Sequence, residues 1–196
     1  MSEFDTSHPS LVVTGMSAAG KSTLIGRILE CPAYSDSRLL HRVTTRGPRQ
    51  SDLPGEYEYV SHDGFMDRFH AGDFLEPTLW HAEMGPSLYG SPTQWLRVLR
   101  QGGQIVSPPS IAVADRIKQR LGESVAWVHL YADDDIKERR LTERGHTDQE
   151  IAARLTVYED GCDGQLRESD LNIDTGFFNV EESFLVLGAF SQLVDA

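Results

Sequence analysis

The sequence predicts an α/β fold in which a mostly parallel β-sheet is covered by helices on both faces. Residues 15–23, GMSAAGKST, fill the phosphate-binding loop pattern G-x-x-x-x-G-K-[ST] at every fixed position. The loop stands between an apolar, β-branched run at 11–14 and a helical pattern over 23–29. Most of the remaining chain alternates strand-like and helix-like segments, as a doubly covered parallel sheet requires. The expected architecture is therefore the three-layer P-loop NTPase fold.

The elements follow from local composition. Buried strands are expected over 11–14, 104–107, 125–131 and 171–174, because these runs are short and mostly apolar. Helices are expected over 23–29, 110–121, 133–144, 147–158 and 180–193. Thr147 and Glu150 have the spacing of a capping box at the start of the fourth of these helices. The acidic run 133–135 is interpreted as a helix start.

Residues 42–95 break the alternation. This segment carries a short β-like piece at 57–60, turns at 54–55 and 84–86, and one helix over about 64–71. We interpret it as an insertion between core strands. The chain then divides into a tail (1–9), a core (10–41 and 96–196) and the insertion (42–95), all within a single domain over 1–196.

Bulk composition excludes several classes of function. The 196 residues carry a formal net charge of -12, which argues against a nucleic-acid-binding surface. Local arginine clusters still permit a small phosphorylated substrate. The sequence has no apolar run long enough to span a membrane and no secretory pattern, and its two cysteines predict no disulfide framework, so we expect a cytoplasmic protein. The oligomeric state stays open.

The phosphate-binding loop assigns chemistry to its residues. Its glycines let successive backbone N–H groups point at phosphate oxygens, and the helix N-terminus adds its dipole. Lys21 is placed to reach the β- and γ-phosphates, and the Ser22 hydroxyl to ligate Mg²⁺. ATP and Mg²⁺ are therefore the expected cofactors, with a donor site made of Gly15, Ser17, Ala18, Ala19, Gly20, Lys21, Ser22 and Thr23.

Further motifs give the chain a resemblance to guanylate kinases over residues 10–176. Each is weak alone, but their order and spacing are those of the family. They are TTRGPR at 44–49, GEYEYV at 55–60, GDFLE at 72–76, HAE at 81–83, LYGS at 88–91 and RRLTERG at 139–145. The resemblance implies that residues 42–95 form an acceptor-binding insertion and that residues from about 137 to 154 form a lid.

The resemblance also implies roles for individual residues. Arg46, Arg49, Tyr57 and Tyr89 would grip the phosphate of the acceptor. Arg140, Arg144 and Arg154 would close over the donor and the transferring phosphate, because a guanidinium pairs two oxygens and keeps its charge. The resemblance therefore implies five catalytic residues: Lys21, Arg46, Arg140, Arg144 and Arg154. The segment LNIDTG at 171–176 resembles a strand end beside the donor adenine in small-molecule P-loop kinases, which adds Asp174 to the donor site.

The base-reading half of the acceptor site departs from the family. The family's D-x-D-x-x-G after the second core strand is replaced by SPPSIAV at 107–113. The carboxylate that orients hydrated Mg²⁺ in the family and the one that helps to read the guanine ring are therefore both missing. Arg42 stands where the family has serine. Glu76 lies in the right local motif, but four extra residues separate it from Tyr89, so Trp80 competes for the same position. His81 is a further candidate acceptor ligand, and Ser91 keeps a guanine-facing identity.

We therefore expect a kinase that moves the γ-phosphate of ATP to a phosphorylated small molecule, with a nucleoside monophosphate as the leading acceptor. The first alternative is a ribose 1,5-bisphosphate phosphokinase, a relative that also lacks the D-x-D pair and resembles residues 79–82. The second alternative is a non-catalytic binding module. Such modules typically lose the P-loop lysine, whereas Lys21 and Ser22 are both present here.

Overall fold

The computed structural model describes residues 9–50, 52–82, 85–107, 110–156 and 168–194, with the side chains of 76–86, 156 and 191–194 excluded. In this part of the chain, five parallel strands form the core sheet in the order β2-β7-β1-β8-β9. Their bounds are Arg38–Leu39 (β2), Gln104–Val106 (β7), Ser10–Gly15 (β1), Val125–Tyr131 (β8) and Leu171–Asp174 (β9). The strand that precedes the phosphate-binding loop, β1, is therefore central.

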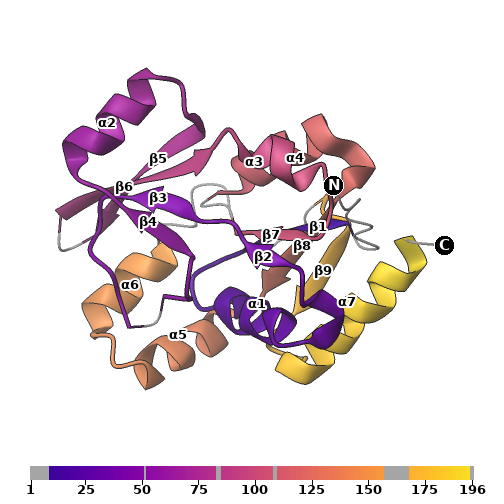
Figure 1. Ribbon diagram of the computed structural model, residues 1–196. Coiled ribbons are helices and arrows are strands. Elements are labelled where there is room, and N and C mark those ends of the chain that lie inside the picture. The colour runs from indigo at the N-terminus through magenta and orange to yellow at the C-terminus, as the bar shows by residue number, and fades with distance from the viewer. Residues whose placement is uncertain (1–8, 51, 83–84, 108–109, 157–167, 195–196) are drawn as a thin grey trace.

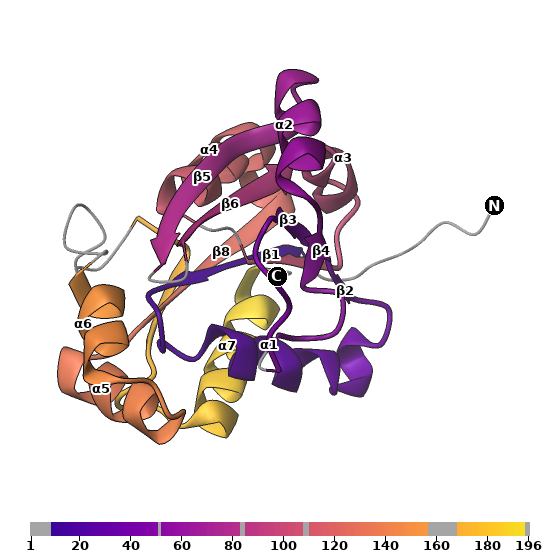
Figure 2. The same ribbon diagram turned by 90° about the vertical axis from the view of Figure 1, so that its left-hand side faces the viewer.

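Helices cover both faces of this sheet (Figure 1). Helices α1 (Lys21–Leu29) and α7 (Val180–Val194) lie on one face, and α3 (Trp95–Leu99) and α4 (Ile111–Leu121) lie on the other. Alternate residues of β1 feed the two cores: Leu11 and Val13 pack with α1, whereas Val12 packs with α3 and α4. This alternation follows from the two-residue period of a strand. The turned view in Figure 2 shows the same layers.

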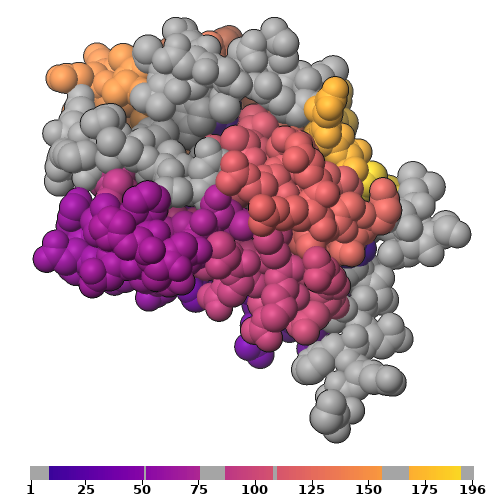
Figure 3. Space-filling model, turned by 90° about the horizontal axis from the view of Figure 1, so that it is seen from above, coloured from indigo at the N-terminus to yellow at the C-terminus, as the bar shows by residue number. Residues whose placement is uncertain are grey.

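Residues 42–92 form a second, mixed sheet of four strands among the described residues, in the order β4-β3-β6-β5. The bounds are Arg42–Thr44 (β3), Tyr57–Tyr59 (β4), Phe74–Ala82 (β5) and Gly85–Pro92 (β6), with α2 at His62–His70. Leu75 of β5 packs into the core cluster of α3 and α4, and Arg116 of α4 donates to its carbonyl oxygen at 2.6 Å. Figure 3 shows this sheet and those helices side by side on one face of the molecule.

Two charged helices, α5 (Asp134–Glu143) and α6 (Asp148–Thr156), follow β8 and contact the loop between β1 and α1 (Figures 1 and 2). The predicted capping box is present: the Thr147 amide donates to Glu150 Oε2 at 2.8 Å, and the Glu150 amide donates to Thr147 Oγ1 at 3.3 Å. Two 3-10 turns, Pro32–Tyr34 and Gly122–Ser124, complete the elements. In the described residues, no helix is long and apolar enough to cross a membrane.

The α/β fold with a parallel core sheet is confirmed, and so are the expected core strands and helices. The insertion differs from its prediction in three places. Gly85 and Pro86 belong to strand β6 rather than to a turn. Helix α2 begins earlier than predicted, at His62, because the Ser61 side chain caps it by accepting from the Gly64 amide at 3.1 Å. Strands β3, β5 and β6 were not predicted, because β3 has only 3 residues and because proline in β5 and proline and glycine in β6 hide the strand pattern.

Candidate active site

The phosphate-binding loop has the backbone that its sequence predicts. Gly15 lies against β8 so closely that a Cβ would stand 2.4 Å from the Leu130 carbonyl oxygen. Ala18 has φ 60° and Gly20 has φ 90°, both in the left-handed region. Ala18 is the non-glycine residue with positive φ in the described part of the chain. Such conformations turn neighbouring N–H groups inward, which makes an anion-binding concavity at the N-terminus of α1.

Lys21 folds back over this loop. Its Nζ donates to the carbonyl oxygens of Gly15 at 2.7 Å and Met16 at 2.8 Å. The pKa of Lys21 is lowered from 10.5 to about 8, chiefly by burial. The positive charges of Arg42 and Arg144 act in the same direction, and the negative charge of Glu56 acts against them.

Arg140 links α5 to the phosphate-binding loop and to the segment after β9. Its Nη1 donates to the Ala18 carbonyl oxygen and to Thr175 Oγ1, both at 3.0 Å, and its Nη2 donates to the Thr175 carbonyl oxygen at 2.5 Å. The same Thr175 hydroxyl lies 3.0 Å from the Ala19 carbonyl oxygen. On α6, Arg154 Nη1 reaches Ser17 Oγ at 3.5 Å. Burial, followed by the neighbouring Arg144, lowers the pKa of Arg140. These contacts bring the predicted Arg140 and Arg154 to the loop.

A pocket of about 260 Å³ opens beside the start of α1. Its walls come from the loop end, from α5 and from the segment after β9, and include Gly20, Thr23, Arg140, Arg144, Thr175 and Ser183. Asp174 is not among its lining residues: its Oδ1 accepts from the Gly176 amide at 2.8 Å and the Phe177 amide at 3.3 Å, which closes a turn after β9. Asp174 thus shapes this wall through the backbone.

The mixed sheet gathers arginine and tyrosine side chains on one face. Arg42 and Tyr57 are register partners on β3 and β4, so both project to the same side. The Arg42 guanidinium lies over the Tyr57 ring, 4.5 Å from its centroid, and Nη2 donates to Glu56 Oε1 at 2.8 Å and to the Tyr57 hydroxyl. Arg42 is 9% exposed and Glu56 is 8% exposed, so this is a buried ion pair.

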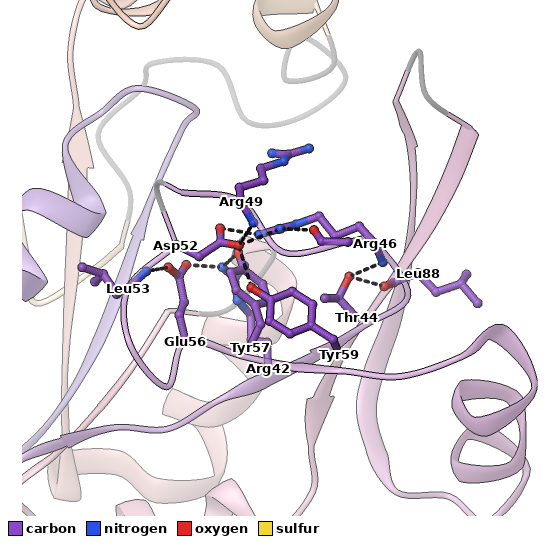
Figure 4. Close-up of polar contacts among 11 residues, drawn as sticks. Arg42, Thr44, Arg46, Arg49, Asp52, Leu53, Glu56, Tyr57, Tyr59 and Leu88 are labelled. Atoms are coloured by element: carbon purple, nitrogen blue, oxygen red, sulfur yellow. Dashed lines mark hydrogen bonds and ion pairs between the residues drawn. The ribbon is translucent and has the colours of Figure 1, made fainter.

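Arg46 is held by a different acid. Its Nη1 and Nη2 donate to the two carboxylate oxygens of Asp52 at 2.8 and 2.6 Å (Figure 4). Its guanidinium also lies 4.3 Å from the Tyr57 ring centroid. Asp52 accepts two further bonds, from the Tyr59 hydroxyl at 2.6 Å and from the Arg49 amide at 2.8 Å. Burial alone would raise the pKa of Asp52, but the hydrogen bonds from Arg46 and Tyr59 lower it to about 2.

The remaining predicted acceptor residues divide into two groups. Arg49 is exposed. Tyr89 is half-buried, and its ring centroid lies 6.2 Å from that of Tyr57. Ser91 is fully buried, and its hydroxyl has no hydrogen-bond partner among the described residues. The side chains of Glu76, Trp80 and His81 lie outside the described part, so the competition between Glu76 and Trp80 stays a prediction. Their backbone belongs to β5, where the pairing register shifts between Phe74 and Pro77.

Sequence reasoning missed Asp52, Glu56 and Tyr59. Asp52 and Glu56 lie in the turn-rich stretch that joins Arg46 and Arg49 to the strand with Tyr57 and Tyr59. That position was the available signal, because it places both acids within reach of guanidinium groups. Lys137 of α5 is also buried, although a lysine on a charged helix is expected at the surface. Lys137 is 2% exposed, and its Nζ lies 3.3 Å from Met16 Sδ and 2.5 Å from Asp134 Oδ1.

Comparison with known proteins agrees with this geometry. Guanylate kinase of Escherichia coli (strain K12) is 30% identical over 145 residues, which cover 73% of this chain and 68% of that enzyme. The chain belongs to the guanylate kinase family. Guanylate kinase of Paraburkholderia xenovorans is 32% identical over 146 residues, and the match spans 62% of its length, just under two thirds. No protein-family model matches the chain.

Solved structures support the fold of this guanylate kinase family member. Guanylate kinase from Anaplasma phagocytophilum superposes with a TM-score of 0.62 at 17% identity, covering 95% of this chain and 86% of that one. A gluconokinase from Sinorhizobium meliloti 1021 gives a TM-score of 0.53 at 18% identity, covering 95% and 94%. At these identities the likeness concerns the fold alone, which is that of P-loop kinases.

Proposed function

We propose that this chain transfers the γ-phosphate of ATP to a phosphorylated small-molecule acceptor, with a nucleoside monophosphate as the leading acceptor. One observation carries the proposal: arginines of both charged helices reach the phosphate-binding loop, Arg140 at the Ala18 carbonyl oxygen (3.0 Å) and Arg154 at Ser17 Oγ (3.5 Å). Guanidinium groups from α5 and α6 therefore gather at the loop that would hold the donor phosphates. In this proposal residues 42–95 bind the acceptor, and residues from about 137 to 154 act as the lid.

The chemistry of phosphoryl transfer matches this arrangement. Charge spreads over the oxygens of the transferring group, so positioning and neutralisation supply most of the catalysis. Lys21 and the loop amides would hold the donor phosphates, and Arg140, Arg144 and Arg154 would approach from the lid. Arg46 and Arg49 would hold the acceptor phosphate in line with the donor. A guanidinium suits each of these roles because it presents several N–H groups and stays charged.

The donor set fits Mg²⁺ held mainly through the nucleotide. Ser22 is exposed in the first turn of α1, and its hydroxyl makes no competing hydrogen bond with the described residues. The described residues contain no group of three His, Cys, Asp or Glu side chains that could hold a metal by themselves. Mg²⁺ keeps several waters and binds substrate phosphates with few protein ligands. Ser22 would hold the ion, and the ion would neutralise charge on the phosphates.

A ribose 1,5-bisphosphate acceptor is the second candidate, and Arg42 favours it. This arginine adds a third guanidinium to a face that already holds Arg46 and Arg49. Only its Nη2 is used in hydrogen bonds with described residues, so Nε and Nη1 stay available to a second anionic group. Ser107, which is buried and begins the segment that replaces the family's D-x-D-x-x-G, supplies no charge for a guanine ring. Loss of such groups weakens discrimination among acceptors.

The test is ATP consumption with Mg²⁺ against GMP, dGMP, AMP, CMP, dTMP, UMP and ribose 1,5-bisphosphate. We expect turnover with one of these acceptors and a loss of at least about 100-fold in Lys21→Ala, because the lysine neutralises the transferring phosphate. A preference for ribose 1,5-bisphosphate with GMP ignored would select the second candidate. Full ATP-dependent activity in Lys21→Ala, or no turnover with any acceptor, would contradict the proposal.

A further inference from the structure

Asp52 accepts hydrogen bonds from several residues beside the arginine and tyrosine side chains of the mixed sheet. It receives donors of three kinds: the guanidinium of Arg46, the hydroxyl of Tyr59 and the backbone amide of Arg49, at 2.6–2.8 Å. The side chain of Asp52 is 12% exposed and that of Arg46 is 7% exposed, so water does little to weaken the pair. Breaking such a buried, hydrogen-bonded pair is costly, so the carboxylate is a fixed part of the site.

Asp52 engages a particular edge of Arg46. A guanidinium has five N–H groups in one plane, and Asp52 takes the end formed by Nη1 and Nη2. The Gly47 carbonyl oxygen takes another Nη1 hydrogen at 2.8 Å. The Nε–H group is buried and has no partner in the described part of the chain. A buried N–H without a partner costs free energy, so this edge is the one that an incoming anion would satisfy.

The same carboxylate also fixes the loop that carries Arg49. The Arg49 amide donates to Asp52 Oδ2, whereas the Arg49 guanidinium has no hydrogen bond or ion pair with described residues. Figure 4 shows this guanidinium pointing away from Asp52. Two arginines are therefore oriented by one acid, one through its side chain and the other through its backbone.

We propose that Asp52 is a positioning residue that shapes the acceptor-phosphate site. It holds the Nη1–Nη2 edge of Arg46 and the loop that carries Arg49. The Nε edge of Arg46 and the Arg49 guanidinium then face one anionic group of the acceptor. The assignment rests on the proposed kinase function. Tyr59 supports the same acid from β4 through its hydroxyl.

The test uses Asp52→Asn in the full chain, with Asp52→Glu as the conservative variant. We expect the acceptor KM to rise about 10-fold or more in Asp52→Asn, because a small displacement of a positioning group has a large kinetic cost. The KM for ATP should stay within about twofold, since Asp52 lies away from the donor pocket. Asp52→Glu should recover a large part of the acceptor affinity because it restores the charge.

Glu58→Gln is the matched control. Glu58 also pairs with an arginine, Arg68, at 2.8 Å, and it stands beside Tyr57 and Tyr59 on the same strand, but on the opposite face. Its acceptor KM should not change. An unchanged acceptor KM in folded Asp52→Asn, or an equal loss in Glu58→Gln, would overturn the assignment while leaving the kinase function in place.

A wild-type protein that turns over no acceptor would instead overturn the proposed function. The assignment is then tested by titrating inorganic phosphate into protein whose donor site is filled with Mg²⁺ and adenylyl imidodiphosphate. Asp52→Asn should bind phosphate about 10-fold more weakly than the wild type and Glu58→Gln. Equal phosphate binding by all three proteins would reject the positioning role.

Discussion

The Lys21 side chain is held in place by hydrogen bonds, and its pKa is lowered. Its ammonium group lies on two loop carbonyl oxygens, while burial and Arg42 lower its pKa to about 8. An unfolded chain would titrate this lysine near 10.5. Between these two values the unfolded chain keeps a proton that the folded chain has lost. Raising the pH through this window therefore favours the folded state.

We expect this effect in the free energy of unfolding. From pH 8 to pH 10.5, the ligand-free wild type should gain about 2–3 kcal/mol relative to Lys21→Met, because the variant has no group to titrate. Urea denaturation at several pH values measures the difference, and titration of the tyrosines cancels in the comparison. Parallel pH profiles for the two proteins would show that the lysine keeps its proton in the folded state throughout this range.

The sequence is sufficient to place Lys21 and Ser22 at the start of α1, because the loop pattern fixes the turn before them within nine residues. It is not sufficient for Asp52 and Tyr59, which reach Arg46 only after β3 and β4 pair in parallel and the intervening turn folds back. Arg42 shows the same limit. Its predicted place in the acceptor site does not reveal that Glu56 neutralises one edge of it.

At the scale of elements, α6 depends on its capping box. Thr147 and Glu150 satisfy each other's backbone amides, and the helix carries Arg154 toward Ser17 of the phosphate-binding loop. Loss of an N-terminal cap costs a helix about 1 kcal/mol. Since α6 is short and peripheral, the cost should fall on its local order and on the approach of Arg154 to the loop.

We therefore expect Thr147→Ala to reduce turnover several-fold while changing the melting temperature of the whole protein little. Steady-state kinetics with saturating ATP and acceptor, together with calorimetry, separate the two effects. Thr142→Ala is a suitable control, because Thr142 is an exposed helical threonine that bonds only within α5, to the Glu138 carbonyl oxygen. Equal kinetics in Thr147→Ala and wild type would mean that α6 needs no cap to act.

Most core elements could be predicted because their hydrophobic period is undisturbed, but β2 and α3 were not, since 2 and 5 residues are too few to show a period. Residues 125–131 are buried almost without interruption, as in a strand covered on both faces. The insertion could not be predicted at the same level. Its strands pair with partners up to 47 residues away, such as Val43 with Gly90, and Gly90 is required where Phe74 packs against its backbone. Such constraints exist only in the folded sheet.

At the scale of the molecule, two parts of the chain present cations without partners. Arg49 on the insertion and Arg144 at the end of α5 make no side-chain hydrogen bond or ion pair with described residues. Short connections around residues 40–41 and 93–94 join the insertion to the core, and Leu75 anchors it on the α3 and α4 side. Phosphates bound between the two parts would supply the missing counter-charge, so binding favours a closed arrangement.

We expect the radius of gyration in small-angle X-ray scattering to fall when Mg²⁺, adenylyl imidodiphosphate and the acceptor are added together, and to fall less with either ligand alone. Arg49→Ala and Arg144→Ala should each weaken the decrease, because each removes one of the cations that the shared phosphates draw inward. Arg97→Ala is the control, since Arg97 lies on α3, away from both groups. An unchanged radius in the ternary complex would mean that the described arrangement is already the closed one, and that the free cations meet the phosphates without any movement of the insertion.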